Sequence, residues 1–174
     1  MCSDLEIRIC TEADISLLER QFSASGPTGV HAFRYARQQE GRSTYLIAWL
    51  EGLPVGHLDL RWDGVQDCEA AQQHLAGCPE LNGIVVLPEC RSQGIGTRLI
   101  SAAEEIARQR GIRAVCVGVA PENGRARALY ERLGYVAWDR GVVDAYWVTV
   151  DAQGRETRHA EQCLYLQKEL SGGE

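Results

Sequence analysis

The stretch from 81 to 120 constrains the fold more than any other part of the chain. Residues 81–87 and 113–120 are two apolar runs rich in Ile and Val, which is typical of buried strands. Between them, residues 94–110 carry apolar side chains at the 3.6-residue spacing of an amphipathic helix, and Gly111 ends it. A strand, a crossover helix and a second strand form a parallel, right-handed unit. The sequence therefore predicts an α/β domain.

The elements on either side of this unit favour antiparallel pairing. Two runs rich in β-formers on each side are separated by short turns containing Gly, which is typical of hairpins. We therefore expect a mixed, largely antiparallel central sheet with one parallel βαβ segment and helices on both faces. The predicted hairpin strands are 43–50 with 55–62 and 145–150 with 161–168; further strands are expected at 5–10 and 135–138, and helices at 11–22, 30–40, 69–75 and 123–133.

Length and composition favour one domain that spans 1–174. There is no apolar run of about 20 residues, the length that crosses a bilayer, so no membrane partner is expected. The net charge of -6 argues against a nucleic-acid partner, because phosphate-backbone binders are usually basic. The seven cysteines form no CxxC pair, which argues against a zinc site and a disulfide framework. With no secretory signal visible at the N-terminus, we expect a cytoplasmic protein.

The charge is unevenly distributed along the chain. Residues 1–90 hold 6 Arg against 13 Asp and Glu, whereas residues 91–174 hold 12 Lys and Arg against 11 Asp and Glu. One half could therefore bind a polyanion while the other faces a cation. The alternative is a solvated surface with scattered charge.

A glycine-containing loop, Arg91-x-x-Gly94-x-Gly96, stands at the start of the predicted long helix. Unpaired N–H groups and the positive end of the helix dipole suit a phosphate there. A Walker loop would need Gly-Lys-Ser/Thr, and a dinucleotide loop would need a third glycine where Leu99 stands. The pyrophosphate loop of a coenzyme A acyltransferase is the third possibility. Alone, a Gly-x-Gly at a helix start is more often a tight turn.

A second motif follows the next strand: Asn123-x-x-Ala-x-x-Leu-Tyr130-x-x-x-Gly134-Tyr135. With both motifs at this spacing, the sequence resembles the GNAT superfamily of acyl-CoA-dependent N-acyltransferases. The resemblance covers about 81–135, which would be the coenzyme-binding core. The flanks, about 11–80 and 138–168, agree in element order and would supply the acceptor side.

The resemblance implies that acetyl-CoA is a co-substrate, and the pattern of cysteines and histidines gives no reason to expect a metal. In the family, the backbone of the strand before the loop pairs with the pantetheine arm, and the loop amides hold the pyrophosphate. Arg125 and Arg127 would meet the 3′-phosphate, or else lie on a solvated helix face. The implied coenzyme-binding residues are Ile84, Val85 and Val86 on the strand, Arg91, Ser92, Gln93, Gly94, Ile95, Gly96 and Thr97 in the loop, and Asn123.

Two catalytic residues follow from the same resemblance. Tyr130 matches the family's tyrosine near the coenzyme sulfur and would act as general acid toward the leaving thiolate. Glu80 precedes the strand, where many members carry an acidic residue, and would be the base. The structural alternatives are a core tyrosine, an exposed strand-edge carboxylate and, for Asn123, a helix N-cap.

Other polar residues could line the acceptor side. His57 and Asp59 alternate with leucines and so share one face, which either lines the cleft or points outward to solvent. Asp144 and Tyr146 could line the acceptor mouth. Cys90 lies beside the loop, but a nucleophilic role would need an adjacent base.

The sequence thus predicts an N-acetyltransferase that moves an acetyl group from acetyl-CoA to a primary amine by direct attack. The acidic N-terminal half favours a small cationic acceptor. The alternatives are a protein or peptide N-acetyltransferase and a non-catalytic acyl-CoA-binding module. The closing hairpin (145–168) also offers strands to a second copy of the chain, so a homodimer stays open.

Overall fold

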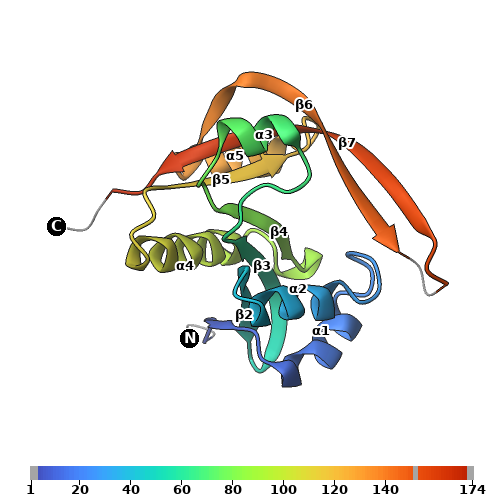
Figure 1. Cartoon of the computed structure of the whole chain (residues 1–174). Helices are drawn as coiled ribbons and strands as arrows, with labels where there is room; N and C mark the ends of the chain where they lie inside the picture. The colour runs from blue at the N-terminus through green and yellow to red at the C-terminus, as the bar shows by residue number, and fades with distance from the viewer. Residues whose placement is uncertain (1–3, 151–152, 172–174) are drawn as a thin grey trace.

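The computed structural model describes residues 4–150 and 153–171. Within these residues the strands form one seven-stranded sheet in the order β1-β2-β3-β4-β5-β7-β6 (Figure 1). Its β4–β5 pair is parallel, and the other neighbouring pairs are antiparallel. The elements are β1 (Glu6–Ile9), η1 (Glu12–Asp14), α1 (Ile15–Gln21), α2 (Val30–Gln39), β2 (Ser43–Leu50), β3 (Leu53–Arg61), α3 (Glu69–His74), β4 (Glu80–Val86), η2 (Pro88–Cys90), α4 (Ile95–Gln109), β5 (Ala114–Val119), α5 (Gly124–Arg132), β6 (Val136–Val150) and β7 (Glu156–Glu169).

The helices cover both faces of this sheet, which confirms the expected fold class. In Figure 1, β2 and β3 pass between α4 on one side and the α1–α2 pair on the other. Helix α4 lies close to β3 because Gly56 has no side chain: a Cβ there would stand 3.2 Å from Leu99 Cδ1 and 3.3 Å from Ile95 Cγ2. The interior on this side is apolar, with Leu58, Leu60 and Leu99 fully buried.

A second, smaller core lies under α3. Ala71 and Leu75 of this segment pack with Cys116, Cys163 and Tyr165 from β5 and β7. The connector between β3 and β4 therefore covers the C-terminal half of the sheet. None of the described helices combines the length and the apolar composition that a membrane crossing requires.

The C-terminal strands differ from the prediction. The stretches 135–138 and 145–150 were expected as separate strands, but both belong to β6. The register with β7 shifts between Ala137 and Val142, and the Trp138 side chain donates its Nε1–H to the Gly141 carbonyl at 2.7 Å. Residues 138–141 form this irregularity. Their sequence predicts a break between two strands, but the strand continues through them. The predicted turn at 151–154 includes residues 151 and 152, which lie outside the described residues.

The β6–β7 hairpin extends beyond the sheet. Strand β7 pairs with β5 over 164–169, whereas residues 156–163 pair with β6 alone. The outer half of the hairpin therefore projects as an arm at the right of Figure 1. The arm joins the connector through a hydrogen bond from Tyr146 N–H to the Asp67 carbonyl at 2.6 Å.

A buried carboxylate connects α4 to the C-terminal strands. Glu104 accepts a hydrogen bond from the Tyr135 hydroxyl at 2.8 Å and contacts Lys168 Nζ at 2.9 Å. Replacing it leaves a phenol and an ammonium group without a partner. We expect Glu104→Ala to lower the free energy of unfolding by about 3 kcal/mol, as for other broken buried ion pairs.

Chemical denaturation measures this difference, with Glu105→Ala as the matched control. Glu105 is the next residue of the helix, but its side chain is 57% exposed, and its salt-bridge partner is Arg108 at 3.4 Å. Its removal should change stability by less than about 0.5 kcal/mol. Equal effects of the two substitutions would show that the Glu104 network does not stabilise the fold.

Candidate active site

The parallel strands β4 and β5 separate soon after they begin. They are paired through Glu80–Cys116 and Leu81–Val117 only, although β4 continues to Val86 beside β3. The β5-facing edge of β4 is therefore unpaired over residues 82–86. Its free backbone groups can bind an extended ligand as an additional strand would bind.

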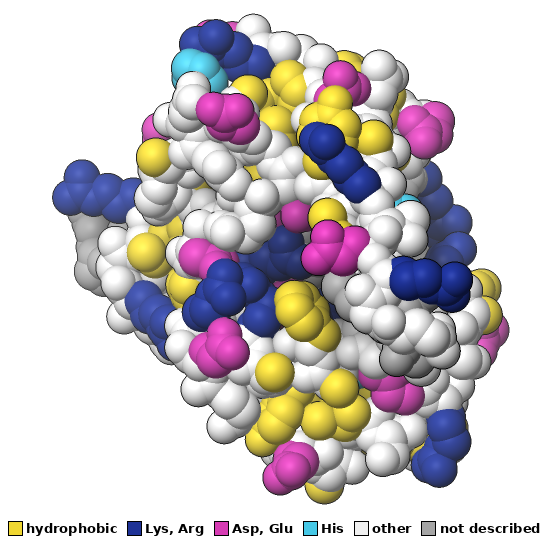
Figure 2. Space-filling view, turned by 45° about the vertical axis from the view of Figure 1, so that its right-hand side comes forward, with side chains coloured by type: hydrophobic (Ala, Val, Ile, Leu, Met, Phe, Trp, Pro, Cys, Tyr) yellow, Lys and Arg dark blue, Asp and Glu magenta, His cyan; other side chains and the backbone are white. Residues whose placement is uncertain are grey.

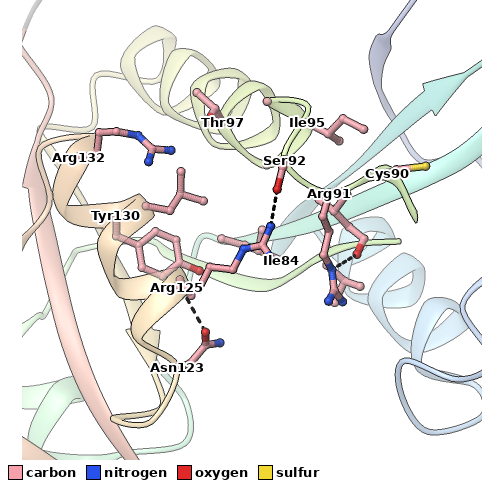
Figure 3. Close-up of a pocket in the computed structure, with 16 residues that line it drawn as sticks. Ile84, Cys90, Arg91, Ser92, Ile95, Thr97, Asn123, Arg125, Tyr130 and Arg132 are labelled. Carbon is pink, nitrogen blue, oxygen red and sulfur yellow. Dashed lines mark hydrogen bonds between the residues drawn. The ribbon is translucent and has the colours of Figure 1, made fainter. Parts of the chain in front are cut away.

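A cavity of about 600 Å³ lies at this opening (Figure 3). Its walls come from the end of β4, the loop before α4, and one face of α5. It is lined by Ile84, Val85, Val86, Cys90, Arg91, Ser92, Gly94, Ile95, Gly96, Thr97, Asn123, Arg125, Ala126, Leu129, Tyr130 and Arg132. Of the coenzyme residues that the sequence predicts, the structure thus brings all but Gln93 to one cavity.

The loop before α4 is shaped for an anion. Ser92 and Gly94 have positive φ angles of 62° and 78°, and Gly94 is the N-cap of α4. Arg91 donates from Nε to the Val86 carbonyl at 3.0 Å and fixes the loop to the end of β4. The first-turn N–H groups of α4 lack helical partners, so they and the helix dipole can hold phosphate oxygens.

Arginine side chains add positive charge to the same wall. Arg91, Arg125 and Arg132 line the cavity, and Arg125 donates to the Ser92 hydroxyl at 2.7 Å. Arg127 is not among the lining residues and instead pairs with Glu131 at 2.8 Å. The sequence analysis did not identify Arg132, which follows Tyr130 by two residues on α5.

Asn123 combines two interpretations that the sequence left open. Its side-chain oxygen accepts a hydrogen bond from Ala126 N–H at 3.1 Å, so it is the N-cap of α5. It also lines the cavity, and its amide nitrogen is not used by the cap. Gln93, in contrast, is exposed and its side chain turns back to the Glu89 carbonyl.

Tyr130 is both a core residue and a cavity residue. Its side chain is buried and packs edge-on against the Tyr135 ring with centroids 6.0 Å apart. Burial raises the pKa of Tyr130 to about 12, so its hydroxyl keeps its proton at neutral pH. It can therefore donate a proton into the cavity.

Glu80 lies outside this cavity, at the start of β4. The alternative of an exposed carboxylate is wrong, because Glu80 is 4% exposed. None of the described residues donates a hydrogen bond to its Oε2, and Arg61 Nη1 stands 3.6 Å away. Burial raises the pKa of Glu80 to about 7, against the opposing effect of Arg61. A carboxyl group with this pKa can take up a proton near neutral pH.

His57 and Asp59 lie on the same face of the sheet as Glu80 and are also buried. The register pairs Asp59 with Asn82 and Arg61 with Glu80, which places these side chains on one side. Both Asp59 oxygens are buried without a hydrogen-bond donor among the described residues, and burial raises the Asp59 pKa. Burial, with the nearby Arg34 charge, lowers the pKa of His57 well below its usual value.

Arg34 completes this face and was not identified from the sequence. Its guanidinium lies over Gly83 of β4, where an added Cβ would collide with it, and its Nη1 stands 3.4 Å from His57 Nδ1. The spacing of His31, Arg34 and Gln38 on α2 marks a polar helix stripe that packs on the sheet. This spacing is the sequence feature that could have identified Arg34 as a residue of the site.

The remaining candidates lie elsewhere or are unreactive. Asp144 and Tyr146 are exposed on the hairpin arm, where Arg158 covers the Tyr146 ring at 4.3 Å. Cys90 lines the cavity, but burial and Glu89 raise the pKa of its thiol, which disfavours a thiolate nucleophile. In the part of the chain that is described, no group of His, Cys, Asp or Glu side chains is arranged to hold a metal ion.

Comparison with known proteins gives the family. Residues 15–135 match the Acetyltransferase (GNAT) family, so the chain belongs to this family of acetyltransferases. It is 33% identical over 112 residues to the uncharacterized N-acetyltransferase YhfO of Bacillus subtilis (strain 168), which covers 64% of this chain and 71% of that protein.

Solved structures share the fold. The ribosomal-protein-S18-alanine N-acetyltransferase from Escherichia coli superposes with a TM-score of 0.68 at 19% identity, over 98% of this chain and 96% of that one. The structure of AAC(6')-Iy, in complex with the bisubstrate analog CoA-S-monomethyl-acetylneamine, has a TM-score of 0.61 at 25% identity, over 76% of this chain and 90% of that one. As a member of this family, the chain is an acyl-CoA-dependent acetyltransferase with acetyl-CoA as co-substrate.

Gly94→Ala tests the loop. An alanine at a φ of 78° costs about 1 to 2 kcal/mol, and the loop amides move to relieve it. We expect the Kd for acetyl-CoA, measured by calorimetry, to rise by about fivefold or more.

Gly111→Ala is the matched control, because Gly111 follows the other end of α4 with a φ of 74° and open space around it. It should lower stability by a similar amount and leave acetyl-CoA affinity unchanged. If both variants weakened binding equally, the loop would not be the coenzyme site.

Proposed function

We propose that this enzyme transfers the acetyl group of acetyl-CoA to the primary amine of a small cationic acceptor within a ternary complex. Residues 81–135 form the coenzyme-binding core of the single domain 1–174. The elements within 11–80 and 138–168 form the acceptor side. The observation that carries the proposal is the unpaired edge of β4, which has the cavity on one side and buried Glu80 at its start.

The pantetheine arm pairs with the β5-facing edge of β4 at Ile84, Val85 and Val86, where the Val86 carbonyl also accepts from Arg91 Nε, and the pyrophosphate lies at the loop before α4. This placement uses two independent features, an unpaired strand edge and a helix N-terminus beside arginines. It brings the thioester to β4 with Tyr130 nearby. A backbone N–H of residues 84–86 then stabilises the oxyanion.

The reaction is a direct displacement at the thioester carbonyl. The amine nitrogen attacks the carbonyl carbon, a C–N bond forms, and the C–S bond of the tetrahedral intermediate breaks. Glu80 accepts the proton from the amine, directly or through a water molecule, and Tyr130 donates a proton to the leaving thiolate. The products are an amide and coenzyme A.

The charges on the two sides of β4 support a cationic acceptor. The coenzyme cavity is lined by Arg91, Arg125 and Arg132, whereas the opposite face holds the carboxylates of Asp59 and Glu80 beside Arg34 and Arg61. The acceptor side thus differs from the coenzyme side in its two buried carboxylates, which can attract a cationic amine. The free thiols of the described cysteines are consistent with a reducing compartment, and we propose a cytoplasmic location.

Release of the coenzyme A thiol from acetyl-CoA tests the proposal, with aminoglycosides, polyamines, amino acids and short peptides as acceptors. We expect release that depends on a small cationic amine. Thiol release that occurs only with peptides would show that the acceptor is a protein or peptide amine and not a small molecule. Binding of acetyl-CoA without release for any acceptor class would favour a non-catalytic module.

Tyr130→Phe separates catalysis from binding. The substitution keeps the ring and its packing but removes the proton donor, so we expect kcat to fall by about 100-fold or more. The Kd for acetyl-CoA should stay unchanged. Tyr35→Phe, on half-buried Tyr35 of α2, is the control and should leave kcat unaltered. An undiminished kcat in Tyr130→Phe would exclude Tyr130 as the acid.

The pH dependence tests Glu80. Because protonated Glu80 cannot accept the amine proton, kcat/KM should fall as the pH drops through about 7, the pKa of this carboxyl group. Glu80→Gln should lower kcat/KM by about 100-fold or more and abolish this step of the profile. A profile of unchanged shape in Glu80→Gln would assign the step to another group, such as the acceptor amine.

A further inference from the structure

The Arg61 guanidinium is shared among three carboxylates. Its Nε stands 3.5 Å from Asp59 Oδ2, and its Nη1 stands 3.6 Å from Glu80 Oε2 and 3.5 Å from Asp67 Oδ2. The side chains of Asp59 and Glu80 are buried, whereas that of Asp67 is 31% exposed and is solvated in part. One positive charge therefore has to serve two carboxylates that water does not solvate.

The pairing of β3 with β4 fixes this arrangement. Arg61 pairs with Glu80, and Asp59 pairs with Asn82, so the four side chains stand at the corners of a square on one face of the sheet. Asp59 and Glu80 occupy opposite corners. Diagonal neighbours in an antiparallel pair are about 7 Å apart, so the charge of one carboxylate acts on the other.

Hydrogen bonds do not stabilise the negative charges. No described residue donates a hydrogen bond to either carboxylate oxygen of Asp59 or to Oε2 of Glu80. Burial raises the pKa of Glu80 to about 7, Arg61 opposes this effect, and the charges of Asp67 and Asp59 add to it. Proton uptake by Glu80 thus depends on how much of the Arg61 charge is available to it.

Other groups from the neighbouring elements face this pair. The charged ones are Arg34 and Arg37 of α2, which act on Asp59, and Asp67, which acts on Glu80. The titratable ones are Tyr45 of β2, Cys116 of β5, and Cys163 and Tyr165 of β7. Burial raises the pKa of Tyr45, Cys163 and Tyr165, and the neighbouring Cys78 thiol raises that of Cys116, so all four stay neutral near pH 7.

The side of the molecule with the hairpin arm and the α1–α2 pair is hollowed. Figure 2 shows this hollow with Lys or Arg side chains deep inside and Asp or Glu side chains around them. The Arg61 side chain is only 13% exposed, so water and salt screen its contacts weakly. A change of charge on one partner of Arg61 is therefore transmitted to the other.

We propose that Asp59 controls the capacity of Glu80 to accept the amine proton, through the one guanidinium that they share. This inference rests on the proposed role of Glu80 as the base and adds a positioning residue to it. While Asp59 is ionised, Arg61 stabilises the charge of Glu80 only in part. When the amine N–H bond breaks and an O–H bond forms on Glu80, Arg61 remains the partner of Asp59, so no buried charge is left alone.

Asp59→Asn tests the proposal, because it keeps the size of the side chain and removes its charge. Arg61 keeps Glu80 and Asp67 as partners, so the variant should fold; Asp59→Ser is a second neutral variant. Without the neighbouring negative charge, ionised Glu80 is stabilised, and the midpoint of its titration should fall by about one pH unit. The Glu80 carboxyl carbon, followed by 13C NMR in the free protein and assigned by its loss in Glu80→Gln, measures this midpoint.

The pH profile of kcat/KM should shift with the titration. At pH 6, Asp59→Asn should show about fivefold more of its own plateau activity than the wild type does, since Glu80 is then about half ionised. A side chain with a merely structural role would lower activity at every pH without moving the profile. The substitution should leave the KM for acetyl-CoA unchanged.

Asp14→Asn is the matched control, because Asp14 is also a buried aspartate but pairs with Arg8 at 2.7 Å. It should lower stability and leave the titration of Glu80 unchanged. An unmoved Glu80 midpoint in Asp59→Asn, or an equal shift in Asp14→Asn, would overturn the inference and leave the proposed acetyl transfer intact. A moved midpoint with an unmoved kcat/KM profile would instead show that Glu80 is not the base and would overturn that role together with this inference.

Discussion

The separation of β4 from β5 is the constraint on which the site depends. The two strands are parallel neighbours for two residue pairs, and then β5 continues beside β7 while β4 continues beside β3. A strand edge inside a sheet is normally paired, so the free edge over 82–86 is a gap that a ligand can complete. Because α4 starts directly after β4 and its loop, the same gap ends at a helix N-terminus.

The alternation of side chains on β4 divides the chemistry between two faces. Glu80 and Asn82 share a face with Asp59, Arg61 and the helices α1 and α2. The coenzyme cavity is lined by the end of β4, the loop before α4 and Tyr130 of α5. A thioester that lies in the gap would thus contact a proton donor from one side and a proton acceptor from the other. The edge-on contact of Tyr130 with Tyr135, which Glu104 anchors, helps to hold that donor in place.

Local sequence patterns predicted the coenzyme cavity, because short continuous segments of the chain form most of its walls. The helix at 95–109, the loop at 91–97 and Asn123 and Tyr130 follow from periodicity and from two motifs, and they line one cavity. The continuity of β6 could not be predicted, because residues 138–141 are an irregularity held between two stretches, 136–137 and 142–150, that both pair with the distant strand β7. The burial of Glu80 could not be predicted either, because it depends on the neighbouring strands β3 and β5 and not on the residues beside Glu80 in the sequence.

The acceptor side was the least predictable region. Arg34 of α2, His57 of β3 and Gly83 of β4 come from three elements that meet only through the order of the sheet and the packing of α2 on it. No spacing along the chain relates them. Net charge over residues 1–90 indicated an acidic surface, but Arg61 lies beside the buried carboxylates of Asp59 and Glu80 on this face.

Hydrogen exchange of the backbone amides, with and without acetyl-CoA, tests the central claim that the gap in the sheet holds the coenzyme. The account predicts slower exchange on binding in residues 82–86 and in the loop 91–97, with β2 and the hairpin arm unchanged. Acetyl-CoA that binds without slowing exchange in 82–86 would contradict it, because the pantetheine arm would then lie elsewhere.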